Sequence, residues 1–461
     1  MTKEQRREII LTKPIFPLLV RMAIPTIIGM LVTMIYNLTD TFFIGQLGNK
    51  SMTAAIGIAF SFVSFIQALG FWFGYGSGNA MSRSLGAGND DEAAILSSTG
   101  IVLALVTGTI LSLTMLFSVE RIAAFLGGNA SDSLLNYSTQ YLRVMICTVP
   151  FSLYATTLYN QMRLCGNVKD GMIGLMTGML CNMILDPIFI FTCKMGFIGA
   201  GWATFAGQAL GAVILTILSM HNGNIPVRLH RVSLRNGRLY HILVGGAPNF
   251  SRQGITSIAA ILLNILAASY GEETIAALTI AGRIAALFYM IMIGWGQGFQ
   301  PICAMNYGAG KYTRVKKALK LSTAIGTIFL IAATFVLAIF AEPLSSVFSK
   351  NPEVIALCTR ILRFQCVSLP FMGVYALSSM FTQNIGKYFT ALLISISRQG
   401  LFYIPLLYLL PPLFAAMGFD AMTGLFCVQP AADIASFLFG GSVMLWCLRR
   451  IQVRSFHGPF L

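Results

Sequence analysis

A carboxylate and an amide stand four residues apart inside a long apolar stretch of the chain. The stretch runs from 172 to 192, and it contains Asn182 and Asp186 in the segment NMILDP. Residues four apart share one face of a helix, so these two side chains are expected to point to the same side. Because a carboxylate deep in a bilayer is costly, Asp186 is a functional candidate by default.

A second pair of the same kind lies near the end of the first apolar run. Asn37 and Asp40 are three residues apart in YNLTD. Oxygen atoms of carboxylates, amides and hydroxyls suit a hard cation such as Na+, whereas two close carboxylates in a low dielectric suit a shared proton. The two pairs therefore predict the ion-coupling site of a transporter, with Na+ and H+ both open. The alternatives are that Asp186 only caps or braces the helix break at Pro187, and that the amides and hydroxyls simply hydrogen-bond neighbouring helices.

The elements that must position these residues are membrane-spanning helices. The chain has 461 residues, of which 56% are hydrophobic and 10% charged, and its mean hydropathy is +0.75. A soluble domain is about 25% charged. The apolar runs reach about 20 residues without the alternation of a barrel strand. We predict an all-α integral membrane protein with no nucleic-acid partner, because its net charge of +15 falls mainly in short loops between spans.

Twelve apolar runs are expected to cross the bilayer. Most Lys and Arg outside them fall at the two ends of the chain and in the even-numbered loops. Positive loops stay on the cytoplasmic side, so both termini are predicted to be cytoplasmic in a multi-pass protein of the cell membrane, the inner membrane where there are two. The runs are roughly 15–39, 52–78, 93–117, 133–158, 165–192, 197–220, 239–267, 274–300, 316–341, 354–380, 388–411 and 421–448.

The chain repeats itself in two halves. Residues 73–89 align without gaps on 295–311, residues 142–151 align on 362–371, and Gly166 then meets Gly386. Six spans per half is an even number, so the repeat is parallel, with its axis along the membrane normal. We predict an N-lobe over 1–220, a basic cytoplasmic linker over 221–238 and a C-lobe over 239–461.

Ordered motifs along the whole chain resemble those of the MATE (multidrug and toxic compound extrusion) transporters, nearest the MepA/DinF-like bacterial branch. They are IPTIIGMLVTMIYNLTDTFFIGQLG, GAGN after span 2, NMILDPIFIF, GFIGAGWAT, GAPNFSRQG and GQGFQPICAMNYGAGK. The resemblance implies two six-helix bundles in a V, and it implies efflux of cationic or amphiphilic drugs against inward Na+ or H+ by alternating access, a route to antibiotic resistance. The alternative is a flippase for lipid-linked oligosaccharide in the same superfamily.

The resemblance also implies a coupling site in the N-lobe. The family builds it from an Asp in span 1, an Asn and an Asp in span 5 and a Thr in span 6. The matching residues here are Asp40, Asn182, Asp186 and Thr204, which would also hold Na+ in a sodium-coupled transporter. A related branch adds acidic residues in spans 7 and 10, which this chain lacks. Coupling is therefore expected to run through the N-lobe.

Further candidates line the same predicted cavity or bend its helices. Asn37, Tyr36 and Tyr141 are candidate cavity residues, although tyrosines at span ends are also common interfacial anchors. Asp433, in span 12, is either a second substrate or protonation site or the partner of Arg252 or Arg398. Prolines free a backbone carbonyl within a helix, so Pro25 and Pro187 are the expected hinges.

An enzyme is not expected. The sequence contains no HExxH, no GxSxG and no paired catalytic His and Asp. Its nine Cys are scattered, without metal-binding spacing, and are expected to be reduced apolar residues. We predict a monomeric transporter that needs no cofactor beyond its coupling ion.

Overall fold

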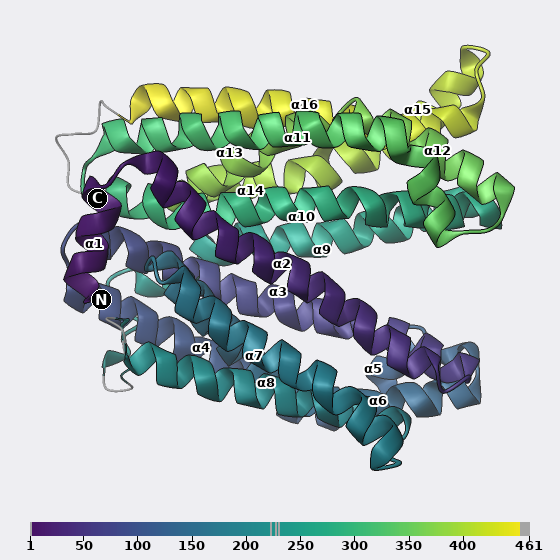
Figure 1. Cartoon of the computed structure of the whole chain (residues 1–461), viewed down its shortest axis with the longest axis horizontal. Coiled ribbons are helices and arrows are strands. Elements are labelled where there is room, and N and C mark those ends of the chain that lie inside the picture. Colours follow the sequence, from purple (N-terminus) through teal and green to yellow (C-terminus); the bar gives the residue numbers. More distant parts are fainter. Residues whose placement is uncertain (1, 222–223, 226–227, 229–230, 452–461) are drawn as a thin grey trace. The chain divides into compact units, whose positions relative to one another are not determined.

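The computed structural model describes residues 2–221, 224–225, 228 and 231–451, without the side chains at 37, 38, 40, 41 and 50. Within this part of the chain the regular structure is helical, with no strand (Figure 1). Eleven helices are long and apolar enough to span a membrane, and the bent pair Pro352–Cys366 and Leu369–Asn384 supplies a twelfth candidate. The predicted all-α multi-span fold is confirmed.

The first compact unit comprises Met1–Lys13 and Ile28–Phe250. A long helix, α6, packs in its centre against α3, α4 and α8. Side chains from three of these helices, among them Ile101, Tyr159 and Leu215, form a continuous buried core. The helices lying wholly inside this unit are α1 (Lys3–Thr12), α3 (Lys50–Gly86), α4 (Asp90–Leu116), α5 (Val119–Phe125), α6 (Asp132–Leu164), α7 (Val168–Pro187) and α8 (Phe197–Met220).

The second unit comprises Pro14–Ile27 and Ser251–Leu461. Its buried core is centred on Tyr375, Ala376 and Ile394, against which Tyr289 and Phe439 pack. Its helices are α10 (Glu272–Gly308), α11 (Tyr312–Phe348), α12 (Pro352–Cys366), α13 (Met372–Asn384), α14 (Tyr388–Ile396), the π-helix η5 (Ser397–Phe402), α15 (Tyr403–Ala416) and α16 (Ala421–Arg450).

Two helices contribute to both units. The first part of α2 (Ile15–Gly45) belongs to the second unit and the part from Ile28 onward to the first. Likewise, α9 (Arg238–Ala268) starts in the first unit and passes into the second after Phe250. Pro25 and Pro248 lie inside these helices, close to each change of unit. The predicted lobes with a linker at 221–238 stay a prediction.

The repeat is visible in the backbone of the turns that join the helices. Gly88 and Gly310, which the repeat aligns, have φ of 80° and 70°, and Gly166 and Gly386 have φ of 83° and 80°. Only glycine adopts this left-handed conformation without strain. These glycines therefore end equivalent helices in both halves, as expected for two bundles of common origin.

Large apolar side chains cover much of the surface. Ile110, Ile261 and Phe335 are 55%, 58% and 64% exposed. Large apolar side chains exposed on helices long enough to span a membrane are those that lipid would solvate.

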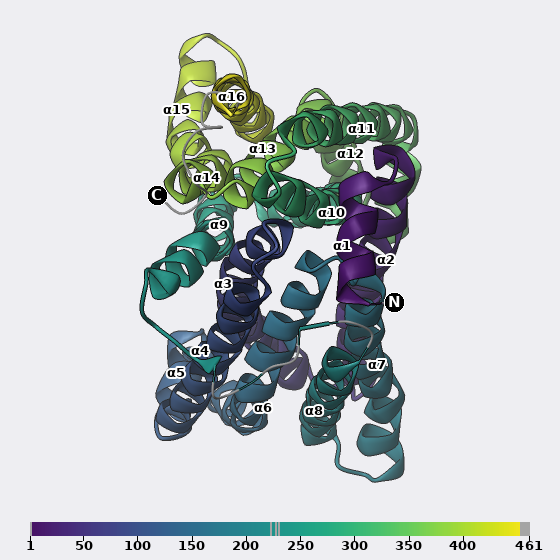
Figure 2. The same ribbon diagram turned by 90° about the vertical axis from the view of Figure 1, so that its left-hand side faces the viewer.

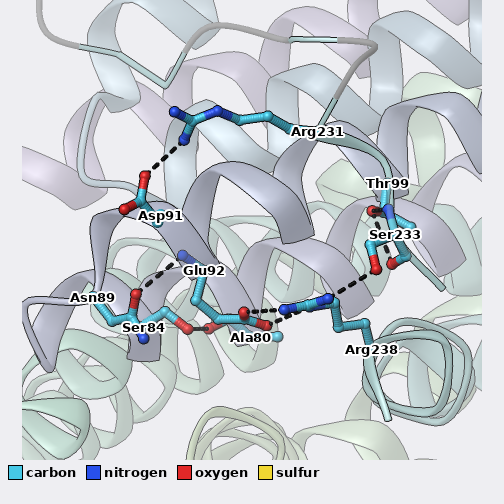
Figure 3. Close-up of polar contacts among 9 residues, drawn as sticks. All are labelled: Ala80, Ser84, Asn89, Asp91, Glu92, Thr99, Arg231, Ser233 and Arg238. Carbon is cyan, nitrogen blue, oxygen red and sulfur yellow. Dashed lines mark hydrogen bonds and ion pairs between the residues drawn. The ribbon is translucent and has the colours of Figure 1, made fainter. Parts of the chain in front are cut away.

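Three consecutive acids start α4 and bind basic residues from other segments. Asp90 pairs with Lys3 at 2.7 Å. Figure 3 shows the other two acids: Asp91 pairs with Arg231 at 2.8 Å, and Glu92 accepts two hydrogen bonds from Arg238, at 2.9 and 2.7 Å. Acids are favoured in the first turn of a helix by its dipole. The triplet therefore holds α1, the segment before α9 and the start of α9 on one helix end.

We expect Glu92→Gln to lower the free energy of unfolding by about 1 kcal/mol, because a two-bond guanidinium–carboxylate pair with side chains only 13% and 20% exposed is stronger than an open one. Thermal unfolding of the purified protein in detergent measures it. Asp91→Asn is the matched control, since Asp91 is 85% exposed and its loss should cost less than about 0.5 kcal/mol. Equal effects of the two substitutions would contradict this ranking.

Candidate ion-coupling site

Helices α7 and α8 lie side by side within the first unit (Figure 1 and Figure 2), and glycines set their separation. A Cβ on Gly178 would stand 2.7 Å from the carbonyl oxygen of Gly207, and a Cβ on Gly207 would stand 2.6 Å from that of Gly178. Gly174 and Gly211, one turn away, extend the same small-residue stripe. Such stripes let spanning helices approach backbone to backbone. The approach places α7 side chains directly against α8.

Three predicted site residues meet just beyond this crossing. The amide nitrogen of Asn182 donates to the Thr204 hydroxyl at 3.1 Å and to Asp186 Oδ1 at 3.4 Å. The Thr204 hydroxyl donates in turn to the Ala200 carbonyl at 3.1 Å. Asp186, Asn182 and Thr204 are 0%, 2% and 4% exposed. The structure thus brings a carboxylate, an amide and a hydroxyl together at one buried point.

One oxygen of this group is able to accept a hydrogen bond or to bind a cation. Asn182 Oδ1 is buried and meets no hydrogen-bond donor among the described residues. A small cavity of ≈ 20 Å³ lies against Asn182 and Thr204, which is room for about one water molecule. Oxygen ligands around a space of this size suit a small hard cation or a proton-carrying water. The space is too small for a drug-sized molecule.

Helix α2 supplies a further wall of this cavity. Tyr36 lines it together with Met179 and Gln208. Asn37 and Asp40 belong to the same helix, but their side chains lie outside the described residues. Gln208 was not predicted, although it follows Thr204 by one turn of α8 and that spacing would have identified it.

Pro187 ends α7, and a π-helical turn, η2 (Ile188–Thr192), follows it. The wider turn is closed by the amide of Cys193, which donates to the Ile188 carbonyl at 2.8 Å. Such π-turns are rare and occur frequently at functional sites. The break places an irregular segment of backbone two residues after Asp186.

Two other candidates lie away from the cavity. The Tyr141 ring is 2% exposed and packs on Phe197, with ring centroids 4.9 Å apart. Asp433 belongs to the second unit, where Arg398 Nε donates to its Oδ1 at 2.6 Å. Of the two alternatives for Asp433, the structure therefore contains the ion pair.

The fold is that of a polytopic helical membrane protein. The family model MatE matches residues 25–188 and 250–409, so the chain belongs to the MATE family, which confirms the resemblance seen in the motifs.

Relatives and solved structures agree with this family. The chain is 30% identical over 406 residues to the multidrug export protein MepA of Staphylococcus haemolyticus, covering 88% of this chain and 89% of that protein. It is 29% identical over 407 residues to MepA of Staphylococcus aureus strain NCTC 8325 / PS 47, with the same coverage. Its fold is similar to a crystal structure of MATE in complex with MaL6, with TM-score 0.87, 23% identity and coverage of 97% and 98%.

Proposed function

We propose that this protein is a secondary active multidrug exporter that exchanges cationic or amphiphilic drugs for inward Na+ or H+. The observation that carries the proposal is the buried, hydrogen-bonded group of Asp186, Asn182 and Thr204. Two of its members, Asn182 and Thr204, line a cavity with room for about one water molecule. The names of the MepA relatives support drugs as the exported substrates.

Coupling follows from the charge of a buried carboxylate. A carboxylate held in a low dielectric strongly favours a cation or a proton beside it. Arrival of Na+ or H+ at Asp186 neutralises the group, with Asn182 Oδ1 and the Thr204 oxygen as further ligands for a metal ion. The proposed site includes Asp40, because Tyr36 lines the cavity. Asp40 follows Tyr36 by four residues, so the two share one face of the helix.

Alternating access requires two conformations of the protein, and bending of a helix is one way to interconvert them. In α2, the residues up to Ile27 belong to one unit and those from Ile28 to the other, and Pro25 lies just before this change. Ala23 and Thr26 are held on α10, where the Thr26 hydroxyl donates to the Gly294 carbonyl at 2.6 Å. Pro25 is therefore the proposed hinge of α2, and Pro187 with its π-turn the hinge of α7.

The proposed setting is the cell membrane, with both termini in the cytoplasm and the protein acting as a monomer. The bias of Lys and Arg towards the chain ends and the even-numbered loops supports this orientation.

The experiment that tests the proposal is transport by the purified full chain in proteoliposomes loaded with a fluorescent cationic dye. Dye is expected to move only when a Na+ gradient or a pH gradient drives Na+ or H+ in the opposite direction. Applying the two gradients separately identifies the coupling ion. Dye movement at the same rate without any gradient, or no movement with either gradient, would refute coupled export.

A further inference from the structure

A polar cluster inside the second unit surrounds Asp433. Its Oδ1 accepts from Arg398 Nε at 2.6 Å and from Gln429 Nε2 at 2.7 Å, and its Oδ2 accepts from Ser368 Oγ at 2.9 Å. The Asp433 side chain is 3% exposed, whereas that of Arg398 is 15% exposed. The carboxylate is therefore enclosed by its donors, and the guanidinium is the accessible member of the pair.

The guanidinium of Arg398 uses only part of its hydrogen-bonding capacity. A guanidinium carries five N–H donors and no acceptor. Its Nε binds Asp433, one Nη faces the Met372 sulfur at 4.0 Å, and the Tyr289 ring lies under the group at 5.1 Å. No other acceptor meets it among the described residues. The planar edge formed by the two Nη groups thus lacks an oxygen partner.

A second guanidinium adds to the positive charge of this region. Arg252, on α9, and Arg398 both lie within electrostatic range of the Tyr375 hydroxyl, which donates to the Ser395 carbonyl at 3.0 Å. Arg252 is half-buried and has no hydrogen-bond acceptor within the described part of the chain. Two guanidinium groups and one carboxylate leave a surplus of one positive charge.

The repeat shows where this surplus lies. Extending the alignment of Gly166 with Gly386 pairs Ala155 with Tyr375, Gly178 with Arg398 and Met179 with Gln399. Ala155, Gly178 and Met179 all line the small cavity of the first unit. The corresponding position of the second unit therefore carries a guanidinium and a phenol in place of a glycine and an alanine. This place is uncharged in one copy of the bundle and basic in the other.

A local irregularity brings Arg398 to this position. It lies in the π-helix Ser397–Phe402, between α14 and α15. A π-turn shifts the side-chain register of a helix and is frequent at functional sites. The Tyr289 ring lies on one side of the guanidinium, and the Gln429 amide donates to the same carboxylate oxygen as Arg398. An aromatic ring beside a few polar groups is common in binding sites for small organic molecules.

We propose that Arg398 and Arg252 form a subsite for the carboxylate of a zwitterionic or anionic amphiphilic substrate. A carboxylate matches the planar guanidinium edge with two parallel hydrogen bonds, and its single negative charge balances the surplus of one, unlike a doubly charged phosphate. The inference rests on the proposed export function, and it assigns the side chains that would bind the acidic group of such a substrate.

Equilibrium binding to the full-length protein in detergent tests the subsite, with two probes that differ in one group. The probes are a rhodamine dye with a free carboxylate and the methyl ester of the same dye, each followed by fluorescence polarisation. In the wild-type protein the free acid is expected to bind more tightly than the ester. Arg252→Gln should raise the ratio of the acid Kd to the ester Kd by about tenfold, the effect of removing a hydrogen bond to a charged group.

A variant without a net change of charge separates binding from folding. Arg398→Gln alone would leave the buried Asp433 carboxylate without its cation, so it is combined with Asp433→Asn. The double variant should raise the ratio of the two Kd values by at least as much as Arg252→Gln. Arg363→Gln is the matched control: Arg363 is an exposed arginine of α12, and its loss should not move the ratio. An unmoved ratio in both Arg252→Gln and the double variant would overturn the subsite, whereas failure of gradient-driven dye export would overturn the proposed function.

Discussion

Asp186→Asn is expected to reduce gradient-driven dye export by about a hundredfold, because loss of even the hydrogen-bonding partner of an ion ligand typically costs about 10–100-fold. An amide has nearly the shape of the carboxylate, so the buried contact with Asn182 can persist. It carries no charge, however, and it cannot take up a proton or bind Na+ with a full countercharge. The variant should therefore fold and still bind drug, but it should lose the exchange between drug and coupling ion. Dye efflux from proteoliposomes measures the rate under whichever gradient drives the wild-type protein.

The control for this prediction is Asp170→Asn. Asp170 is in the first turn of the same helix, where the Asn167 amide donates to it at 2.7 Å, well separated along α7 from the cavity beside Asn182. The two substitutions remove the same charge from the same helix. Export by Asp186→Asn at the wild-type rate, with equal amounts of protein in the vesicles, would remove the carboxylate from the coupling mechanism.

The contact between Asn182 and Asp186 could be predicted from the sequence because its signal is local. A spacing of four residues identifies the shared face of Asn182 and Asp186, and the apolar surroundings mark the carboxylate as costly. Thr204 required the family resemblance, because a threonine in an apolar helix is otherwise unremarkable. The number and order of spans also follow from the sequence, since about twenty apolar residues suffice to identify each one.

Contacts between segments far apart in the sequence could not be predicted in the same way. Arg252 and Arg398 were equally good partners for Asp433 on spacing alone, and only the packing of α16 on the π-helix around Arg398 selects the pair. The repeat divides the chain between α8 and α9, but it does not show that α2 and α9 each pass from one compact unit to the other. A long helix can change neighbours along its length without any change in its own apolar pattern.

Glycines illustrate the same limit. The chain has 44 of them, and their positions alone do not separate turns from close helix crossings. Gly57 has no atom within 4 Å of an added Cβ, whereas Gly207 has the backbone oxygen of Gly178 at 2.6 Å and the Cβ of Asn182 at 2.9 Å. Both occur inside helices, so the difference arises entirely from what packs against them.

This difference predicts opposite effects for the same substitution. Gly207→Ala must push α7 away from α8, because the nearest atom belongs to a backbone that no side-chain rotation can move. We expect it to lower the free energy of unfolding by about 1–3 kcal/mol, and also to weaken coupling, since the added methyl group displaces Asn182. Gly57→Ala, the matched control, should raise stability by about 0.5–1 kcal/mol through the lower flexibility of alanine in a helix. Thermal unfolding in detergent compares the two, and a Gly207→Ala protein as stable as Gly57→Ala would show that the glycine crossing does not position the site.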